Sequence, residues 1–149
     1  MKTNQILVGL GLAATLLAGS WTLNACGSVD LPADVAQASA ALPDKIDYNL
    51  HVKPILSDRC FVCHGPDQNK QKAGLRLDIA EAAYEKECEN GMKAIVPSNA
   101  AKSDLVKRIL SADLDYVMPE PQSHLALSAE EKAVLVKWVQ QGAEYKPHW

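Results

Sequence analysis

One short stretch of this chain, CFVCHGP at residues 60–66, holds two thiols and an imidazole within five positions and ends in a turn-forming Gly-Pro pair. In a helical turn, residues three apart lie on one side, so both thiols would face the same way. The remaining sequence offers few large side chains, since 149 residues include 5% aromatics and a single phenylalanine. A domain of this size has a thin core, so a group held by the motif would contribute to it.

The motif admits three interpretations, which differ in how many of its residues they use. A redox dithiol uses only the two cysteines, and its thioredoxin-like form requires a strand-helix-strand context that the sequence before Cys60 does not predict. A structural zinc ion needs four thiolate or imidazole ligands. No second ligand pair occurs at short spacing among the other candidates, which are His51, His64, Cys88 and His124.

Covalent attachment of a c-type haem is the interpretation that uses every residue of the motif. Cys60 and Cys63 would each add to a vinyl group at the porphyrin edge, and His64 would reach the iron from one face. The Gly-Pro pair would then turn the chain away. We therefore expect one covalently bound haem c, and its large apolar ring would supply the core that the side chains lack.

The opposite face of the iron has room for a second ligand, and a methionine thioether there raises the reduction potential. Of the three methionines, Met1 begins the chain, Met92 follows a glycine in a short loop, and Met118 lies in the proline-rich stretch DYVMPEP. Pro119 stiffens the backbone beside Met118. We expect Met118 to be the ligand, the alternatives being ligation by His124 or an open site.

The first 25 residues have the features of an export signal, with a basic start and a mostly apolar stretch at 6–23. The sequence LNAC at 23–26 resembles the lipobox of bacterial lipoproteins, whose cysteine accepts a lipid. We expect Cys26 to begin the mature chain and carry acyl groups; an ordinary secretory peptide or an uncleaved anchor is the alternative. The protein would then lie on the periplasmic or cell-surface side of a bacterial membrane.

Composition and periodicity divide the remaining chain into two parts. Residues 26–45 are rich in Ala, Ser, Asp and Pro and lack apolar periodicity, so we expect a flexible tether, with a short Ala-rich helix as the alternative. From residue 46 the apolar spacing is helical and strand signals are scarce, which predicts an all-α domain over 46–149. Capping boxes at 78–81 and 128–131 predict the starts of two helices.

Four stretches, HVKPILSDRCFVCHGPDQNKQKAGLRLD, AIVPSNAAKSDLVKRIL, VMPEP and LSAEEKAVLVKWVQQGAEYKPHW, resemble the Planctomycete-type cytochrome c domain, a branch of the monohaem cytochrome c fold. The resemblance spans nearly all of 46–149. It implies a small cytochrome c fold with three to five helices around one covalently bound haem. It also implies that Cys60 and Cys63 carry the haem and that His64 ligates the iron. The second ligand would be Met118, which matches the methionine of the family's Met-Pro-Pro motif.

These observations predict the function of an electron carrier. The net charge of −3 and the pI of about 5.8 argue against a nucleic-acid partner. We expect an exported, lipid-anchored, monomeric cytochrome c that carries single electrons between redox partner proteins and is not an enzyme in its own right. The alternatives are a haem module that serves or senses for a larger enzyme, and a zinc-stabilised lipoprotein without haem.

Arg76 would either pair with a haem propionate or lie on the surface.

Overall fold

The computed structural model describes residues 29–147, so the expected export signal and Cys26 lie outside the described residues. Six α-helices and no β-strand occur in this part of the chain, where only isolated bridges link Lys93 to Glu87 and to Ser103. The predicted all-α class is therefore confirmed. Within the same residues, no helix has the length and apolar character needed to cross a membrane.

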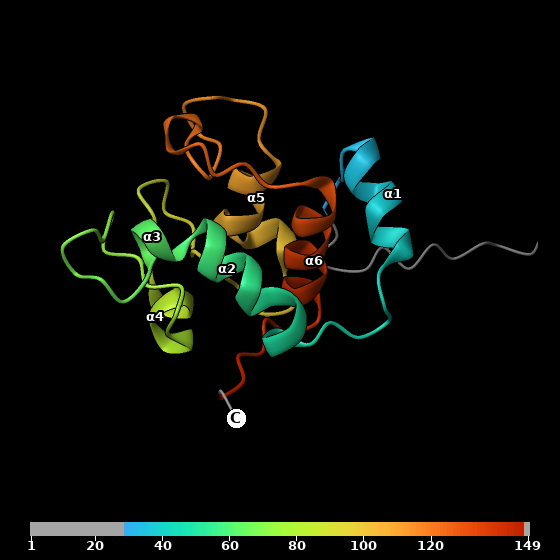
Figure 1. Cartoon of the computed structure of the whole chain (residues 1–149), viewed down its shortest axis with the longest axis horizontal. Helices are drawn as coiled ribbons and strands as arrows, with labels where there is room; N and C mark the ends of the chain where they lie inside the picture. The colour runs from blue at the N-terminus through green and yellow to red at the C-terminus, as the bar shows by residue number, and fades with distance from the viewer. Residues whose placement is uncertain (1–28, 148–149) are drawn as a thin grey trace, which may run out of the picture.

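Several elements pack on α6, which lies between α5 and α1 in Figure 1. Helix α1, the turns η1 and η2, and α5 all pack on it. Long loops connect α3 to α4 and α5 to α6, and Figure 1 shows the second loop arching above α5. The elements are α1 (Ala33–Ala41), the π-helical turn η1 (Tyr48–Val52), α2 (Lys53–Arg59), α3 (Phe61–His64), α4 (Ala80–Glu85), the 3-10 turn η2 (Ala100–Lys102), α5 (Asp104–Leu110), the 3-10 turn η3 (Pro121–Ser123) and α6 (Ala129–Gln140).

The core lies where α2, α5 and α6 meet. Leu56, Val106, Leu135 and Val139 are each 0% exposed and belong to one buried cluster. Leu135 and Val139 are four positions apart on α6 and therefore lie on one face of the helix. Cys60 also belongs to this cluster, so the first cysteine of the motif is attached directly to the packed core.

The structure corrects the expectation that residues 26–45 form a tether without packed structure. Residues Ala33–Ala41 form α1, which packs along α6, and its Val35 is only 1% exposed. Five of the nine residues of α1 are alanines, the residue type with the highest helix propensity. One valine and several small alanines are enough for α1 to pack closely on α6, so this helix needs no apolar stripe in its sequence.

The two predicted capping boxes have different outcomes. At α6, the Ser128 Oγ accepts a hydrogen bond from the Glu131 amide at 3.1 Å, and the Glu131 carboxylate accepts one from the Ser128 amide at 2.7 Å, so this prediction is confirmed. The box at 78–81 is wrong, because α4 begins after Ile79 and has no side-chain cap. The Asp78 carboxylate binds the Arg76 guanidinium instead, and a bidentate, charge-assisted pair outcompetes a cap.

We expect Ser128→Ala to lower the free energy of unfolding by about 1 kcal/mol, because the variant leaves an amide at the start of α6 without its acceptor. Urea denaturation of the purified protein measures this change. Ser57→Ala on α2 is the matched control, since the Ser57 side chain is exposed, and its effect should stay within about 0.5 kcal/mol. Equal losses in the two variants would contradict the prediction.

Candidate functional site

The motif at residues 60–66 forms a single helical turn that follows α2. The amides of Cys63 and His64 donate to the Cys60 carbonyl at 3.1 and 2.8 Å, so the expected turn is present. Gly65 ends it, and a Cβ at this position would lie 2.4 Å from the Phe61 carbonyl oxygen. Only glycine therefore allows the chain to leave the turn so closely.

The two thiols of the motif are free and differ in their surroundings. Cys60 is 9% exposed and Cys63 is half-buried. Burial raises the pKa of the Cys60 thiol to about 12, and the nearby Glu131 carboxylate acts in the same direction. The attacking thiol of a redox dithiol has a lowered pKa, so Cys60 is not suited to that role in this environment.

His64 is held in place by its backbone, while its ring remains available. Its carbonyl accepts a hydrogen bond from the Leu77 amide at 2.8 Å. The Nδ1 atom is buried and has no hydrogen-bond partner, and an unpaired buried nitrogen costs free energy. Burial lowers the pKa of the imidazole. A neutral imidazole has a lone pair with which it can bind a metal, so His64 is suited to the predicted role.

Met118 lies on the loop between α5 and α6. Its amide donates to the Arg108 carbonyl at 3.2 Å, which ties the loop to the end of α5. Met118 lines a cavity of about 460 Å³, together with apolar side chains that include Leu125 and Leu127. His124, the alternative ligand, is exposed and lines the same cavity. Met118 and His124, the two candidate ligands, therefore both line this largely apolar cavity.

Lys72 connects the motif to the loop of Met118. Its amide donates to the Cys63 carbonyl at 2.8 Å, and its Nζ donates to the Glu120 carboxylate at 2.9 Å. Glu120 is two positions after Met118, and its charge is close enough to act on the pKa of His64. The structure thus brings the motif and the Met118 loop to the same side of the molecule, although 48 residues separate Lys72 from Glu120.

This region fits a covalently held haem in three respects. It has two free thiols on one helical turn, a buried imidazole nitrogen without a partner, and a thioether beside an apolar cavity of about 460 Å³. Cys60, Cys63 and His64 do not line this cavity, so the structure brings the motif and the Met118 loop together through Lys72 and Glu120. For zinc, no group of three or more His, Cys, Asp or Glu that could hold a metal ion occurs among residues 29–147.

Comparison with known families gives one result that bears on this site. Residues 60–122 match the family model described as Planctomycete cytochrome C. Over these residues, the chain is similar to the cytochrome c domains of this family. Cytochromes c bind haem and transfer electrons, and the matched residues include Cys60, Cys63, His64 and Met118. No curated protein and no solved structure matched the chain.

The match covers a shorter part of the chain than the resemblance over 46–149. Helices α3, α4 and α5 lie within the matched residues, whereas α1, α2 and α6 lie outside them. Five of the six described α-helices begin after residue 46, in agreement with the three to five helices expected for a small cytochrome c fold. The helices outside the match supply much of the core on which Cys60 packs.

Within the matched residues, Arg76 binds a carboxylate of the chain itself. Its Nε and Nη2 donate to the two oxygens of Asp78 at 2.6 and 2.5 Å. The pair encloses Leu77, whose amide donates to the His64 carbonyl. Arg76 and Asp78 therefore stabilise the segment that holds the backbone of His64, a role that the sequence did not reveal.

The Arg76 guanidinium lowers the pKa of Asp78 from its usual value of 3.8, which makes a prediction about pH. A carboxyl group with a lowered pKa in the folded state stabilises the protein above its unfolded pKa, and this contribution disappears as the pH falls through the folded value. We expect the free energy of unfolding to decline more steeply below about pH 4 in the wild type than in Asp78→Asn. Urea denaturation at pH 7, 4 and 3 measures the slopes.

The control for this pH series is Asp58→Asn, because Asp58 is an exposed carboxylate on α2. It should keep the steep decline of the wild type. Identical slopes in the wild type and Asp78→Asn would show that the Arg76–Asp78 pair contributes nothing to acid stability.

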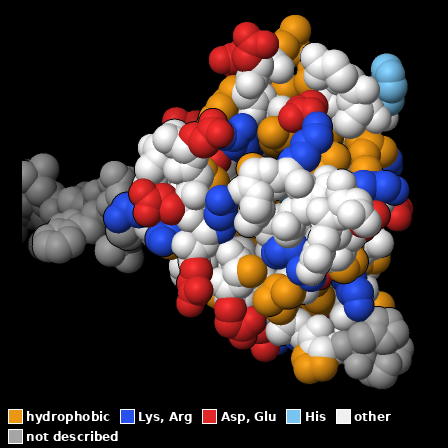
Figure 2. Space-filling view, turned by 90° about the vertical axis from the view of Figure 1, so that its left-hand side faces the viewer, with side chains coloured by type: hydrophobic (Ala, Val, Ile, Leu, Met, Phe, Trp, Pro, Cys, Tyr) orange, Lys and Arg blue, Asp and Glu red, His pale blue; other side chains and the backbone are white. Residues whose placement is uncertain are grey.

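The face of the molecule that carries α3 and α4 has charges of both signs. Figure 2 shows Lys and Arg side chains interspersed with Asp and Glu, and apolar atoms between them. Lys72 pairs with Glu120, and Lys70 lies 3.9 Å from Asp67. The positive side chains near the motif therefore have negative neighbours, and this face has no uniform positive field.

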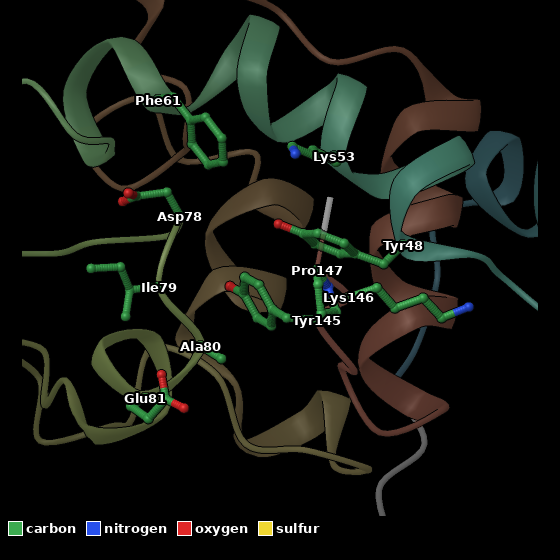
Figure 3. A pocket seen from close by; sticks show the side chains of 10 residues that line it. All are labelled: Tyr48, Lys53, Phe61, Asp78, Ile79, Ala80, Glu81, Tyr145, Lys146 and Pro147. Carbon is green, nitrogen blue, oxygen red and sulfur yellow. The ribbon is translucent and has the colours of Figure 1, made fainter. Parts of the chain in front are cut away.

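A second cavity, of about 550 Å³, lies beside the first residue of α3. Figure 3 shows Phe61, Tyr48 and Tyr145 around it, with Asp78 and Glu81 on another side. The lining of this cavity comes from segments that are far apart in the chain. No short-range pattern in the sequence marks it.

Proposed function

We propose that this protein is an exported monohaem c-type cytochrome that carries single electrons. Haem c would be bound through Cys60 and Cys63, and its iron ligated by His64 and Met118. The family match over residues 60–122 is the observation that supports this proposal most strongly. Haem c supplies an iron that alternates between the ferric and ferrous states, so no substrate bond is broken and the protein acts as a carrier rather than a catalyst.

The residues of the chain have separate tasks in this function. The two cysteines fix the ring to the turn after α2, and the buried Cys60 anchors it to the core. His64 would bind the iron through its imidazole, and burial lowers the pKa of this ring and so favours its neutral form. The Met118 thioether favours the reduced state and raises the potential, and the apolar wall beside it limits the access of water.

We also propose that Cys26 carries a lipid after removal of residues 1–25, and that the domain works at a bacterial membrane surface with redox partner proteins. The lipobox-like sequence LNAC supports this. Because α1 begins at Ala33, only a few residues separate it from Cys26. At about 3.5 Å per residue, the folded domain would stay within roughly 25 Å of its anchor.

The experiment is to produce the full chain in a bacterial host that matures c-type cytochromes and to purify the exported protein. We expect an intact mass that includes one haem, and a reduced visible spectrum of the c type. The same chain from a host without the maturation system is the control and should lack the added mass. A correctly exported, colourless product from the maturing host would refute the proposal.

A further inference from the structure

Asp104, the first residue of α5, has a buried carboxylate with several partners. The residue is 1% exposed, and burial of a charge is costly unless hydrogen bonds compensate for it. The Arg108 Nε donates to Asp104 at 2.7 Å and the Asn90 Nδ2 at 2.6 Å, and the Tyr116 hydroxyl donates to the same carboxylate. Three side chains from three segments thus converge on one buried group.

Two of these partners lead directly to Met118. The Arg108 guanidinium lies over the Tyr116 ring, with its Cζ 4.4 Å from the ring centroid, and its Nη1 donates to the Tyr116 carbonyl at 3.4 Å. The Arg108 carbonyl accepts the Met118 amide at 3.2 Å. Asp104 therefore binds both residues that hold the backbone on the N-terminal side of Met118.

The segment that leads into Tyr116 provides little other support. Its residues 112–115 are all exposed. Segments with few buried apolar contacts open easily. The hydrogen bonds to the charged Asp104 group, which are stronger than those between neutral groups, are therefore the main tertiary contacts that fix residues 116–118.

We propose that Asp104 is a positioning residue for Met118, acting through Arg108 and Tyr116 to hold the loop in the conformation that presents the thioether to the haem iron. This inference rests on the proposed function, since it requires Met118 to be the ligand. Its consequence is that the strength of the methionine bond depends on a carboxylate that contacts neither the haem nor Met118.

The first test measures how readily free imidazole replaces the distal ligand in the ferric holoprotein. In Asp104→Asn, which keeps the shape of the side chain but removes its charge, we expect imidazole to bind at least about tenfold more tightly and the reduction potential to fall. Tyr116→Phe should change both in the same direction, by about threefold in affinity. Asp47→Asn, which removes a carboxylate paired with Lys146, is the control and should match the wild type.

A second set of variants separates the failure of this inference from that of the proposed function. Met118→Ala should raise the imidazole affinity strongly, and adding Asp104→Asn to it should cause no further change, because Asp104 acts through the methionine. If Met118→Ala has no effect, methionine ligation is wrong and the inference falls with it. If Met118→Ala has a large effect but Asp104→Asn changes the affinity less than twofold, only the inference is overturned.

Hydrogen exchange of the Met118 amide, followed in the holoprotein, reports on the loop independently of ligand affinity. We expect exchange at least about tenfold faster in Asp104→Asn than in the wild type. An unchanged exchange rate would overturn the inference. Should Asp104→Asn not yield folded holoprotein, Tyr116→Phe decides, because it retains the stacked ring; wild-type exchange and affinity in that variant would overturn the inference.

Discussion

Replacement of both Cys60 and Cys63 by alanine is expected to abolish covalent haem attachment completely. Each thiol would form one thioether bond, and the structure places both on one turn beside the core. Loss of the bonds should also reduce the stability of the fold, because a ligand that binds only the native state stabilises it. The intact mass of protein purified from a maturing host measures attachment, and the thermal midpoint measures stability.

Cys88→Ala is the matched control for this prediction. Cys88 is the third free cysteine among residues 29–147, and it lies after α4, outside the motif. We expect this variant to keep the mass of the haem-bearing protein. The single variants Cys60→Ala and Cys63→Ala should retain at most one thioether bond, and haem released by acid extraction would reveal a remaining non-covalent fraction. Covalent haem in the double variant would contradict the assignment.

Met118→Ala is expected to lower the reduction potential by on the order of hundreds of millivolts, within the roughly 0.8 V span that axial ligands cover in haem proteins. The thioether stabilises ferrous iron relative to ferric, and alanine would leave the position open to water or another weak ligand. A spectroelectrochemical titration of the holoprotein gives the potential, and the visible spectrum of the ferric form reports the loss of methionine ligation.

Met92→Ala provides the control, since Met92 is the other methionine among residues 29–147 and lies on a different loop. Its backbone contacts with Cys88 and Asn90 do not require its side chain, so the potential should stay at the wild-type value. His124→Ala tests the alternative ligand from the same cavity. A normal potential in Met118→Ala combined with a large shift in His124→Ala would exchange the assigned roles.

Structural features whose deciding interactions lie within one or two helical turns are predictable from the sequence. The spacing of Cys60 and Cys63 predicts a shared turn, and the spacing of Ser128 and Glu131 predicts a reciprocal cap; the structure has both. The same local rule was wrong at Asp78, because Arg76 competes for the carboxylate from two residues away. A cap pattern does not show which of two nearby partners will bind.

The structure of segments with few apolar residues is harder to predict, because their packing depends on a surface that is distant in the sequence. Helix α1 has a single buried valine, so its sequence resembles a tether, yet α6 provides a surface on which small alanines pack closely. The low apolar content of α1 could not indicate this without knowledge of where α6 lies. A packed α1 leaves a much shorter linker to Cys26 than composition suggests.

The order of residues along the chain is enough to predict the chemistry of the site: two thiols and an imidazole at a spacing that suits a haem, and a methionine in a stiff loop. It also predicts the all-helical character of residues 29–147. Only the tertiary structure decided how the methionine loop is held. Lys72 reaches Glu120 across 48 positions, and the Asp104 carboxylate joins Asn90, Arg108 and Tyr116. Such contacts leave no periodic pattern, because they depend on where the chain returns in space rather than on the order of neighbouring residues.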